Sequence, residues 1–460
     1  LFSFRRAGLT ESFGMKVLKS INNNVVSFLD ENGRELVAMG RGLGFAVRSG
    51  EPDFLIALFS ATSATCVTGH TVIDPYTYFT GFGQAVMLVL IQIGGLGFIT
   101  IISLFMLYIK KDVTLSDRKL AMQSAGGLKM AGLKGLLKYI FIGTFSLEFL
   151  GAVLLAISFV PDYGWGLGIW QAVFTSVSSF CNAGFSLTGA GGDLSLAGYN
   201  SDPLFLIVVM ALITIGGLGF YVWYDVIKGR FRPSRYSLHT KVVLISTGAI
   251  LLLAWALFMA FEWNNDGTIG KMNAGDKVLN CLFFAVTPRT AGHYTVDMNY
   301  FSDGAYILTN VLMFVGGSPG STAGGVKTTT FVVLVLTMVA ACRRERQVRV
   351  FKRGIEGDDV ISAVTVTMLY MFAIIISVLI AGQEVPNVVN FKNVLFEVIS
   401  AISATGLTLG ITAELSALSQ VILILLMFFG RVGGYTLILV FSETRRPPTI
   451  TRLPEHIMIG

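Results

Sequence analysis

The sequence predicts an all-α polytopic membrane protein made of four pseudo-symmetric repeats around one central axis. Two observations predict this class. Of the 460 residues, 53% are hydrophobic and only 13% are charged, whereas soluble domains are about one-quarter charged. In addition, four short segments end alike, and their glycines Gly69, Gly184, Gly292 and Gly406 are separated by 115, 108 and 114 residues. Regular spacing of this kind indicates an internal repeat.

Each of the four segments has small or hydroxyl residues before its glycine and lies between hydrophobic stretches. The segments are Thr65-Cys66-Val67-Thr68-Gly69, Asn182-Ala183-Gly184, Arg289-Thr290-Ala291-Gly292 and Ser403-Ala404-Thr405-Gly406. Backbone at membrane depth is tolerated where it is buried in protein or lines a water-filled path, and glycine adopts dihedrals that a Cβ forbids. Four such loops around one axis would form a ring of carbonyl oxygens able to replace the hydration shell of an ion. The alternative for any one glycine is a helix C-cap, but four matched sites favour the ring.

Each repeat is expected to be a helix–pore-loop–helix unit. Short re-entrant helices are predicted at 53–65, 170–181, 277–286 and 393–403, and spans at 79–109, 139–158, 204–226, 242–263, 305–341, 361–382 and 417–441. These elements divide the chain into repeat 1 (53–138), repeat 2 (139–241), repeat 3 (242–360) and repeat 4 with a C-terminal tail (361–460). Gly-Gly-Leu-Gly at 94–97 recurs at 216–219, which supports a common origin of the units.

Residues 1–52 form a polar segment that differs from the rest of the chain. They contain no apolar run near the roughly 20 residues that a spanning helix needs, and no apolar central region of a signal peptide. We expect a cytoplasmic or peripheral segment, so that repeat 1 lacks a normal outer helix. Because the chain opens with Leu1, we also expect a fragment or a processed form.

The basic residues are distributed asymmetrically between the predicted connections. One side carries Lys110, Lys111, Arg118, Lys119, Lys129, Lys134, Lys138, Lys228, Arg230, Arg232, Arg235, Lys241, Arg343, Arg344, Arg346, Arg349, Lys352, Arg353, Arg445, Arg446 and Arg452. The other side has no base from 159 to 203 and only Lys392 from 383 to 416. Excess Lys and Arg mark the cytoplasmic side, so the glycine loops are predicted to face outside. Topology explains the charge without a nucleic-acid partner, and none is expected.

Cysteine and histidine indicate no metal or haem site. The four cysteines (Cys66, Cys181, Cys281, Cys342) have no metal-ligand spacing and are expected to be free. The four histidines are scattered along the chain. The sequence also has no clustered acids and no nucleophile with a neighbouring base, so we do not expect an enzyme.

The motifs resemble the Ktr/Trk/HKT superfamily of potassium transporters, and most closely the membrane (pore-forming) subunit of bacterial Ktr systems. The stretches that carry the resemblance are 64–69, 92–98, 180–185, 285–292 and Gly430-Arg431-Val432-Gly433. The resemblance covers residue 53 to the C-terminus. The chain departs from the family at residues 22–50, where the family's first outer helix is expected.

The resemblance implies a selectivity filter for K⁺, which is the transported ion. The filter residues would be Val67, Thr68, Gly69, Asn182, Ala183, Gly184, Thr290, Ala291, Gly292, Ala404, Thr405 and Gly406. A serine at the first position is associated with sodium in some plant relatives, so four glycines suggest potassium. The resemblance further implies a homodimer in the bacterial plasma membrane, bound to a cytoplasmic ring of RCK-type nucleotide-binding subunits. No cofactor is expected in this chain, and Na⁺ remains a candidate activator.

The predicted span 305–341 is interrupted by a glycine-rich segment. It comprises Gly316, Gly317, Ser318, Pro319, Gly320, Ser321, Thr322, Ala323, Gly324 and Gly325. Pro319 breaks a helix, and at mid-membrane such a loop must line a cavity. By resemblance this is the intramembrane gating loop (316–326). A phosphate-binding loop is disfavoured, because Lys327 does not directly follow a glycine and no strand precedes the segment.

Three ionisable residues lie in or near apolar helices. Arg431 is predicted in the middle of one, where a charge is costly and usually faces a cavity. It is assigned to the gate as an electrostatic barrier under the filter, with a structural tie to loop carbonyls as the alternative. Glu148 and Glu262 are expected to brace pore loops through backbone amides, unless Glu262 lies at the membrane surface.

The function predicted from these features is potassium uptake through a channel-like pore. The alternative is a sodium- or proton-coupled secondary cation transporter, whose broken helices also bind ions at the midplane. Such transporters usually show two related halves, whereas this chain shows four quarter-length units.

Overall fold

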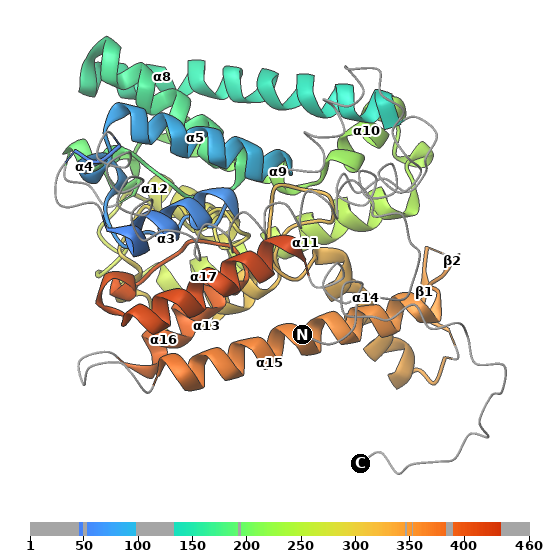
Figure 1. Cartoon of the computed structure of the whole chain (residues 1–460). Coiled ribbons are helices and arrows are strands. Elements are labelled where there is room, and N and C mark those ends of the chain that lie inside the picture. The colour runs from blue at the N-terminus through green and yellow to red at the C-terminus, as the bar shows by residue number, and fades with distance from the viewer. Residues whose placement is uncertain are drawn as a thin grey trace, which may run out of the picture.

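The computed structural model describes residues 46–48, 53–97, 133–191, 195–345, 347–351, 353–382 and 390–433. Nearly all regular structure in these residues is helical (Figure 1), as the sequence predicted. The strands of the described part are β1 (Arg349–Val350) and β2 (Arg353–Gly354), which pair antiparallel. Most of the predicted polar segment 1–52 lies outside the described residues, as do the predicted spans beyond residues 97 and 433.

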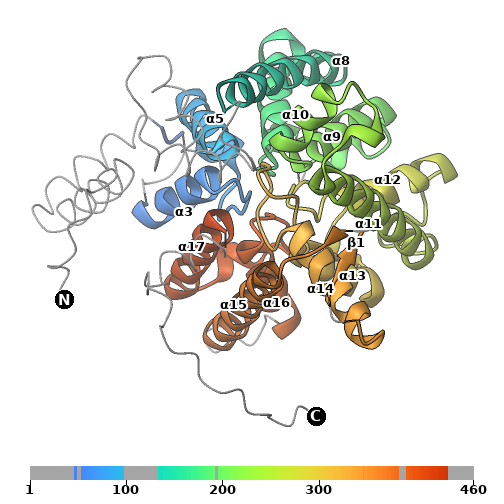
Figure 2. The same ribbon diagram turned by 90° about the vertical axis from the view of Figure 1, so that its right-hand side faces the viewer.

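The helices follow one another in chain order around a common centre (Figure 2). They are α3 (Phe54–Thr65), α4 (Pro75–Tyr78), α5 (Gly81–Leu96), α8 (Leu133–Cys181), α9 (Pro203–Gly217), α10 (Phe220–Lys228), α11 (Leu238–Glu262), α12 (Ala274–Val286), α13 (Asp303–Phe314), α14 (Thr328–Cys342), α15 (Gly357–Ala381), α16 (Phe391–Ile402) and α17 (Ala417–Val432). Short 3-10 helices are η1 (Thr188–Gly191), η2 (Ala197–Tyr199), η3 (Pro233–Arg235), η4 (Met298–Tyr300) and η5 (Ile411–Glu414). Because α17 packs against α3, the last helix closes the arrangement against the first.

The short helices lie close to where the sequence placed them. The helices α3, α12 and α16 begin and end within three residues of the predicted bounds. The second short helix is the latter part of α8, which consists of two helices separated by a break at Gly164, three residues after Pro161. Gly164 has non-helical dihedrals, with a φ of 77°. The predicted span and the predicted re-entrant helix are thus two helices, with a sharp change of direction between them.

The predicted span 204–226 is not one straight helix. The chain forms α9 and α10 there, and the two helix axes differ by 91°. The change of direction occurs at Gly219, whose φ of +97° is rarely adopted by residues with a Cβ. By contrast, the interruption predicted in 305–341 is present, because α13 ends at Phe314 and α14 begins at Thr328.

The outer helices have the length and surface expected in a bilayer. Among the described residues, α8 (over 137–181), α11 and α15 are long and apolar enough to cross a membrane, and the bent pair α9–α10 would make a fourth span. Phe149, Leu252 and Leu379, one on each of these long helices, are 73%, 63% and 63% exposed. Lipid is as apolar as these side chains, so the exposure is not costly there.

Each helix that follows a glycine segment starts at a capping residue. The caps are Thr80, Asp202, Ser302 and Ser416, at the starts of α5, α9, α13 and α17. In all four the side-chain oxygen accepts a hydrogen bond from the backbone N–H three residues later. A cap of this type supplies an acceptor that the first helical turn lacks. Local sequence therefore sets where these helices begin.

Glycines allow three of these helices to touch the short helices directly. A Cβ placed on Gly94, Gly216 or Gly430 would collide with the carbonyl oxygen of Thr65, Phe180 or Ile402, respectively. Each of these carbonyls lies four residues before a glycine that the sequence had singled out. The end of each short helix is thereby fixed against α5, α9 or α17.

The adjacent glycines Gly216 and Gly217 provide a test of this packing. Gly216→Ala is expected to destabilise the protein by about 1–3 kcal/mol, the usual cost of forcing extra volume into a packed site. Gly217→Ala is the matched control, because a Cβ there would lie 3.5 Å from the Asn182 amide nitrogen, an ordinary contact. The measurement is thermal unfolding of the two purified variants in detergent. Equal melting temperatures would contradict the packing argument.

Candidate functional site

The four glycine segments meet at the centre of the helix arrangement. We call them loop 1 (67–69), loop 2 (182–184), loop 3 (290–292) and loop 4 (404–406). A Cβ placed on Gly184 would lie 2.8 Å from the Ala291 carbonyl oxygen. In the same way a Cβ on Gly69, Gly292 or Gly406 would collide with the carbonyl oxygen of Ala183, Thr405 or Thr68. Each glycine thus faces the residue before the next glycine, and the four contacts close a ring.

The loops share one backbone pattern. The residue two before each glycine has a positive φ, namely Val67 (56°), Asn182 (59°), Thr290 (69°) and Ala404 (51°). The glycines have φ of 92°, 71°, 76° and 84°. A positive φ is uncommon in residues with a Cβ and is strained for a β-branched one, and such strain persists only where the surroundings enforce it. Four repetitions of one strained pattern point to a shared task.

The amide groups of the loops point back toward the short helices. In loop 1 the Val67 and Thr68 amides donate to the carbonyls of Ala64 and Ser63, at 3.1 and 2.8 Å. Loops 2 and 4 repeat this pattern, and in loop 3 Ala291 donates to Thr287. No hydrogen bond among the described residues uses the carbonyls of Thr68, Ala183, Ala291 or Thr405 as acceptors. These oxygens are available to a ligand at the ring.

The four short helical segments all end at the ring. The helices α3, α8, α12 and α16 have their last residues at Thr65, Cys181, Val286 and Ile402, within four residues of the loops. The C-terminal end of a helix carries about half a negative charge from its unpaired carbonyls. Four such ends around one centre favour a cation there, and the described residues contain no cluster of metal-ligating side chains. Any cation at the ring would depend on backbone oxygen.

The glycine-rich segment 316–325 lies between loop 2 and loop 4. On one side, Ser318 N–H donates to the Gly217 carbonyl at 3.1 Å, and Thr322 Oγ1 donates to the Phe180 carbonyl at 3.2 Å. On the other side, a Cβ on Gly324 would lie 2.8 Å from the Ser403 carbonyl oxygen. The segment thus contacts the ends of two short helices, next to the ring.

Arg431 binds carbonyl groups of two other units. It is the penultimate residue of α17, which ends at Val432, so it lies in the last turn of the described helix rather than mid-helix. One guanidinium nitrogen donates to the carbonyl of Thr322, in the glycine-rich segment, and the other donates to the carbonyls of Gly94 and Gly95. Arg431 thus joins the end of α17 to one loop carbonyl, that of Thr322, and to two carbonyls in the last turn of α5.

The two acids singled out in the sequence have different surroundings. Glu262 is fully buried within the protein. It accepts hydrogen bonds from Ser302 N and Oγ, Asn265 Nδ2 and Thr268 Oγ1, at 2.6–2.9 Å. It therefore braces the start of α13 through one backbone amide, not a pore loop. Glu148 lies 3.7 Å from the Cys181 thiol at the end of α8 and accepts no backbone amide among the described residues.

Sequence reasoning missed Glu397, His70 and Lys327. Glu397 lies on α16, fully buried, with His70 beside it. Lys327 Nζ donates to the Ala323 carbonyl at 2.8 Å, within the connection between α13 and α14. A signal for Glu397 was available, because it is an acid within a short apolar helix. Glu148 was singled out in the sequence for a similar reason, as an acid within an apolar stretch.

Comparisons with known proteins give a family. Residues 41–447 match the family described as TrkH, cation transport protein. The chain is 39% identical to the Ktr system potassium uptake protein B of Bacillus subtilis (strain 168) over 398 residues, which cover 86% of this chain and 87% of that protein. It is 38% identical to the potassium/sodium uptake protein NtpJ of Enterococcus hirae, over 91% of this chain and 92% of that protein.

The fold also matches a solved structure. The potassium transporter TrkH from Vibrio parahaemolyticus superposes with a TM-score of 0.65 at 19% identity, over 85% of this chain and 79% of that one. Separately, residues 15–53 match a family described as CAT RNA binding domain. That match lies almost wholly outside the described residues and falls on the predicted polar segment.

Proposed function

The chain belongs to the TrkH family of cation transport proteins, and we propose that it carries potassium into the cell through a channel-like pore with a four-glycine filter. The observation that carries the proposal is the closed ring of contacts among Gly69, Gly184, Gly292 and Gly406. The names of the relatives support potassium as the ion, since these include two potassium uptake proteins B and a potassium/sodium uptake protein.

Selection in this proposal depends on backbone carbonyls rather than charged side chains. A K⁺ ion entering the ring exchanges its water shell for carbonyl oxygens of loops 1–4. The four helix C-termini around the ring offset part of the cost of dehydration. In each of the four loops, the filter consists of the glycine and the two residues before it. No step makes or breaks a covalent bond.

The glycine-rich segment 316–325 serves as the gate in this proposal, together with Arg431. The segment lacks helical hydrogen bonds, lies beside the ring, and is held to α17 by the Arg431–Thr322 bond. Among the described residues Arg431 has no carboxylate partner, so its positive charge adds a barrier to a passing cation. Moving the segment would change both the width of the path and the position of that charge.

The orientation follows from the distribution of basic residues. At the end of the molecule where α10, β1 and β2 lie (Figure 1), the exposed bases include Arg232, Arg235, Arg343, Arg349 and Arg353. We assign this end to the cytoplasm, in a multi-pass plasma-membrane protein whose loops 1–4 face outward. The proposal also includes the repeat boundaries predicted from the sequence, a homodimer, an RCK-type ring on the cytoplasmic face, and Na⁺ as an activator.

The alternative is a sodium- or proton-coupled secondary cation transporter. The name of the Enterococcus relative includes sodium, which makes sodium a candidate for the coupled ion. Potassium uptake into vesicles under an imposed voltage separates the two. A pore passes K⁺ without any sodium or proton gradient, whereas a coupled transporter stops when both gradients are removed.

Replacing the first glycine tests the filter. Gly69→Ser is expected to reduce the preference for K⁺ over Na⁺, because a Cβ would push against loop 2 and displace carbonyls of the ring. The measurement is uptake of each ion by a host that lacks its own potassium uptake systems. Gly164→Ser is the matched control, because Gly164 also has a positive φ (+77°) but has open space around it. An unchanged ion preference in Gly69→Ser would count against the filter.

Replacing the arginine tests the barrier. Arg431→Gln is expected to raise the maximal rate of K⁺ uptake several-fold with little change in KM, because the repulsive charge is lost while the ring is intact. Initial uptake rates over a range of K⁺ concentrations measure both constants. Arg431→Lys serves as the control, since it keeps the charge but loses the fork that reaches several carbonyls. Equal maximal rates in the wild type and Arg431→Gln would remove Arg431 from the transport mechanism.

A further inference from the structure

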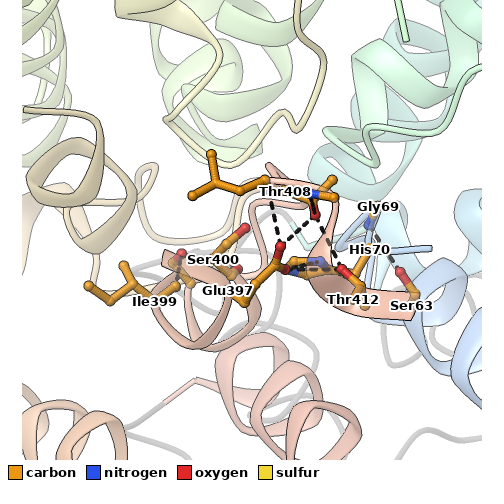
Figure 3. A network of polar contacts seen from close by, with 11 residues as sticks. Ser63, Gly69, His70, Glu397, Ile399, Ser400, Thr408 and Thr412 are labelled. Carbon is orange, nitrogen blue, oxygen red and sulfur yellow. Dashed lines mark hydrogen bonds and ion pairs between the residues drawn. The ribbon is translucent and has the colours of Figure 1, made fainter. Parts of the chain in front are cut away.

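A buried carboxylate supports loop 4 from behind. Glu397 lies on α16, nine residues before Gly406, and is 0% exposed. Its Oε1 accepts hydrogen bonds from Thr408 Oγ1 at 2.5 Å and from the Leu409 backbone N–H at 3.1 Å. Its Oε2 accepts from Thr412 Oγ1 at 3.1 Å (Figure 3). All three donors lie in the segment that follows Gly406, so the carboxylate fixes where the chain goes after loop 4.

The same carboxylate reaches the chain that follows loop 1. His70 comes directly after Gly69 and is fully buried. Its Nδ1 lies 3.2 Å from Oε2 of Glu397 (Figure 3). One side chain therefore touches the outgoing segments of two loops. These are the two loops that meet where Gly406 faces the Thr68 carbonyl oxygen, a contact we call the 4–1 contact.

Among the described residues, no equivalent carboxylate lies beside the segments that follow loops 2 and 3. The position after the glycine is occupied by Phe185 in loop 2 and Leu407 in loop 4. In loop 3 it is His293, whose Nε2 lies 3.2 Å from the neutral hydroxyl of Ser179 on α8. His70 and His293 thus hold corresponding positions in opposite loops, but only His70 faces an acid. Among the described residues, the 4–1 contact is thus the part of the ring with a carboxyl group behind it.

Burial makes this arrangement rigid. A carboxylate removed from water is tolerated only when its oxygens keep hydrogen-bond partners. Taking one partner away from a buried charge costs far more than a surface contact is worth. The segment after loop 4 cannot therefore shift without leaving part of the carboxylate unsatisfied. A shift of the segment after loop 1 would separate His70 Nδ1 from the same carboxylate.

We propose that Glu397 is a positioning residue for ion selection: it holds loops 1 and 4 together through His70, Thr408, Leu409 and Thr412 and so sets the spacing of carbonyls at the 4–1 contact. This inference rests on the proposed function of the ring as a potassium filter. Glu397 is a positioning residue and not an ion ligand in this proposal, because its carboxylate lies behind the loops and contacts their outgoing segments.

The first experiment compares two buried glutamates in the full-length protein reconstituted in liposomes. Glu397→Gln is expected to raise the KM for K⁺ and lower the K⁺/Na⁺ preference about tenfold, the factor that corresponds to losing one charged hydrogen bond. The maximal rate should change much less. Glu262→Gln is the control, because Glu262 is equally buried and accepts four hydrogen bonds, but at the start of α13.

The control separates a positioning role from general destabilisation. Both glutamine variants are expected to melt at a lower temperature, but only Glu397→Gln should change ion preference. Equal ion preference in the two variants would overturn the proposal. If Glu397→Gln cannot be purified, Thr408→Val removes a single hydrogen bond of the same carboxylate. It should lower the preference in the same direction by a smaller factor, and no change would likewise overturn the proposal.

The second experiment tests the link to loop 1. His70→Asn keeps an N–H donor near the position of Nδ1 and should retain the ion preference, whereas His70→Leu should lose it. The reverse order, or no loss in His70→Leu, would show that Glu397 does not act through loop 1. Gly69→Ser separates this inference from the filter itself. If Gly69→Ser loses the preference while Glu397→Gln keeps it, the filter stands and the positioning role is wrong.

Discussion

The close approach of peptide backbones is the constraint on which the rest of the structure depends. At the ring, four glycines face carbonyl groups at distances that admit no side chain, and at Gly94, Gly216 and Gly430 three helices touch the ends of the short helices in the same way. A carbonyl placed there without an N–H donor is costly unless water or a cation satisfies it. Glycine therefore does two things at once: it permits the approach, and it leaves the oxygens available for an ion.

The chain after loop 3 departs from this arrangement, and the departure explains the segment 316–325. After loops 1, 2 and 4 a glycine of α5, α9 or α17 contacts the short helix, whereas after loop 3 α13 stops at Phe314 and a non-helical segment follows. That segment supplies donors to the last carbonyls of α9, because Ser318 and Thr322 N–H groups donate to Gly217 and Gly216. Helix ends lack such partners of their own. The bend after α9 and the segment 316–325 thus stabilise each other, and breaking these hydrogen bonds would free both to move.

The sequence alone predicted those features of the fold that depend on local composition. Apolar runs located the helices, glycine spacing located the four loops, and Pro319 with its neighbouring glycines located the interruption between α13 and α14. The bend at Gly219 was missed because it depends on a partner about 100 residues away, the Gly320 carbonyl that accepts from Phe220 N–H. The contact of His70 with Glu397 was missed for the same reason, since no local pattern specifies which acid meets which histidine across the ring.

Two ionisable groups near the ring have different surroundings, and the difference bears on how ions would leave it. Glu397 has a donor for each oxygen, and its hydrogen bonds fix the outgoing segment of loop 4 beside His70 of loop 1. Arg431 bonds only to neutral carbonyls among the described residues, so its positive charge is not cancelled. Conduction requires sites that attract an ion enough to admit it and hold it weakly enough to let it go. In the proposed pore, carbonyls and helix C-termini would provide the attraction, and the positive charge of Arg431 would form a barrier to leaving the ring. Because Arg431 is bonded to Thr322, the height of that barrier would depend on where the segment 316–325 lies, which would couple the proposed gate to the rate at which ions pass.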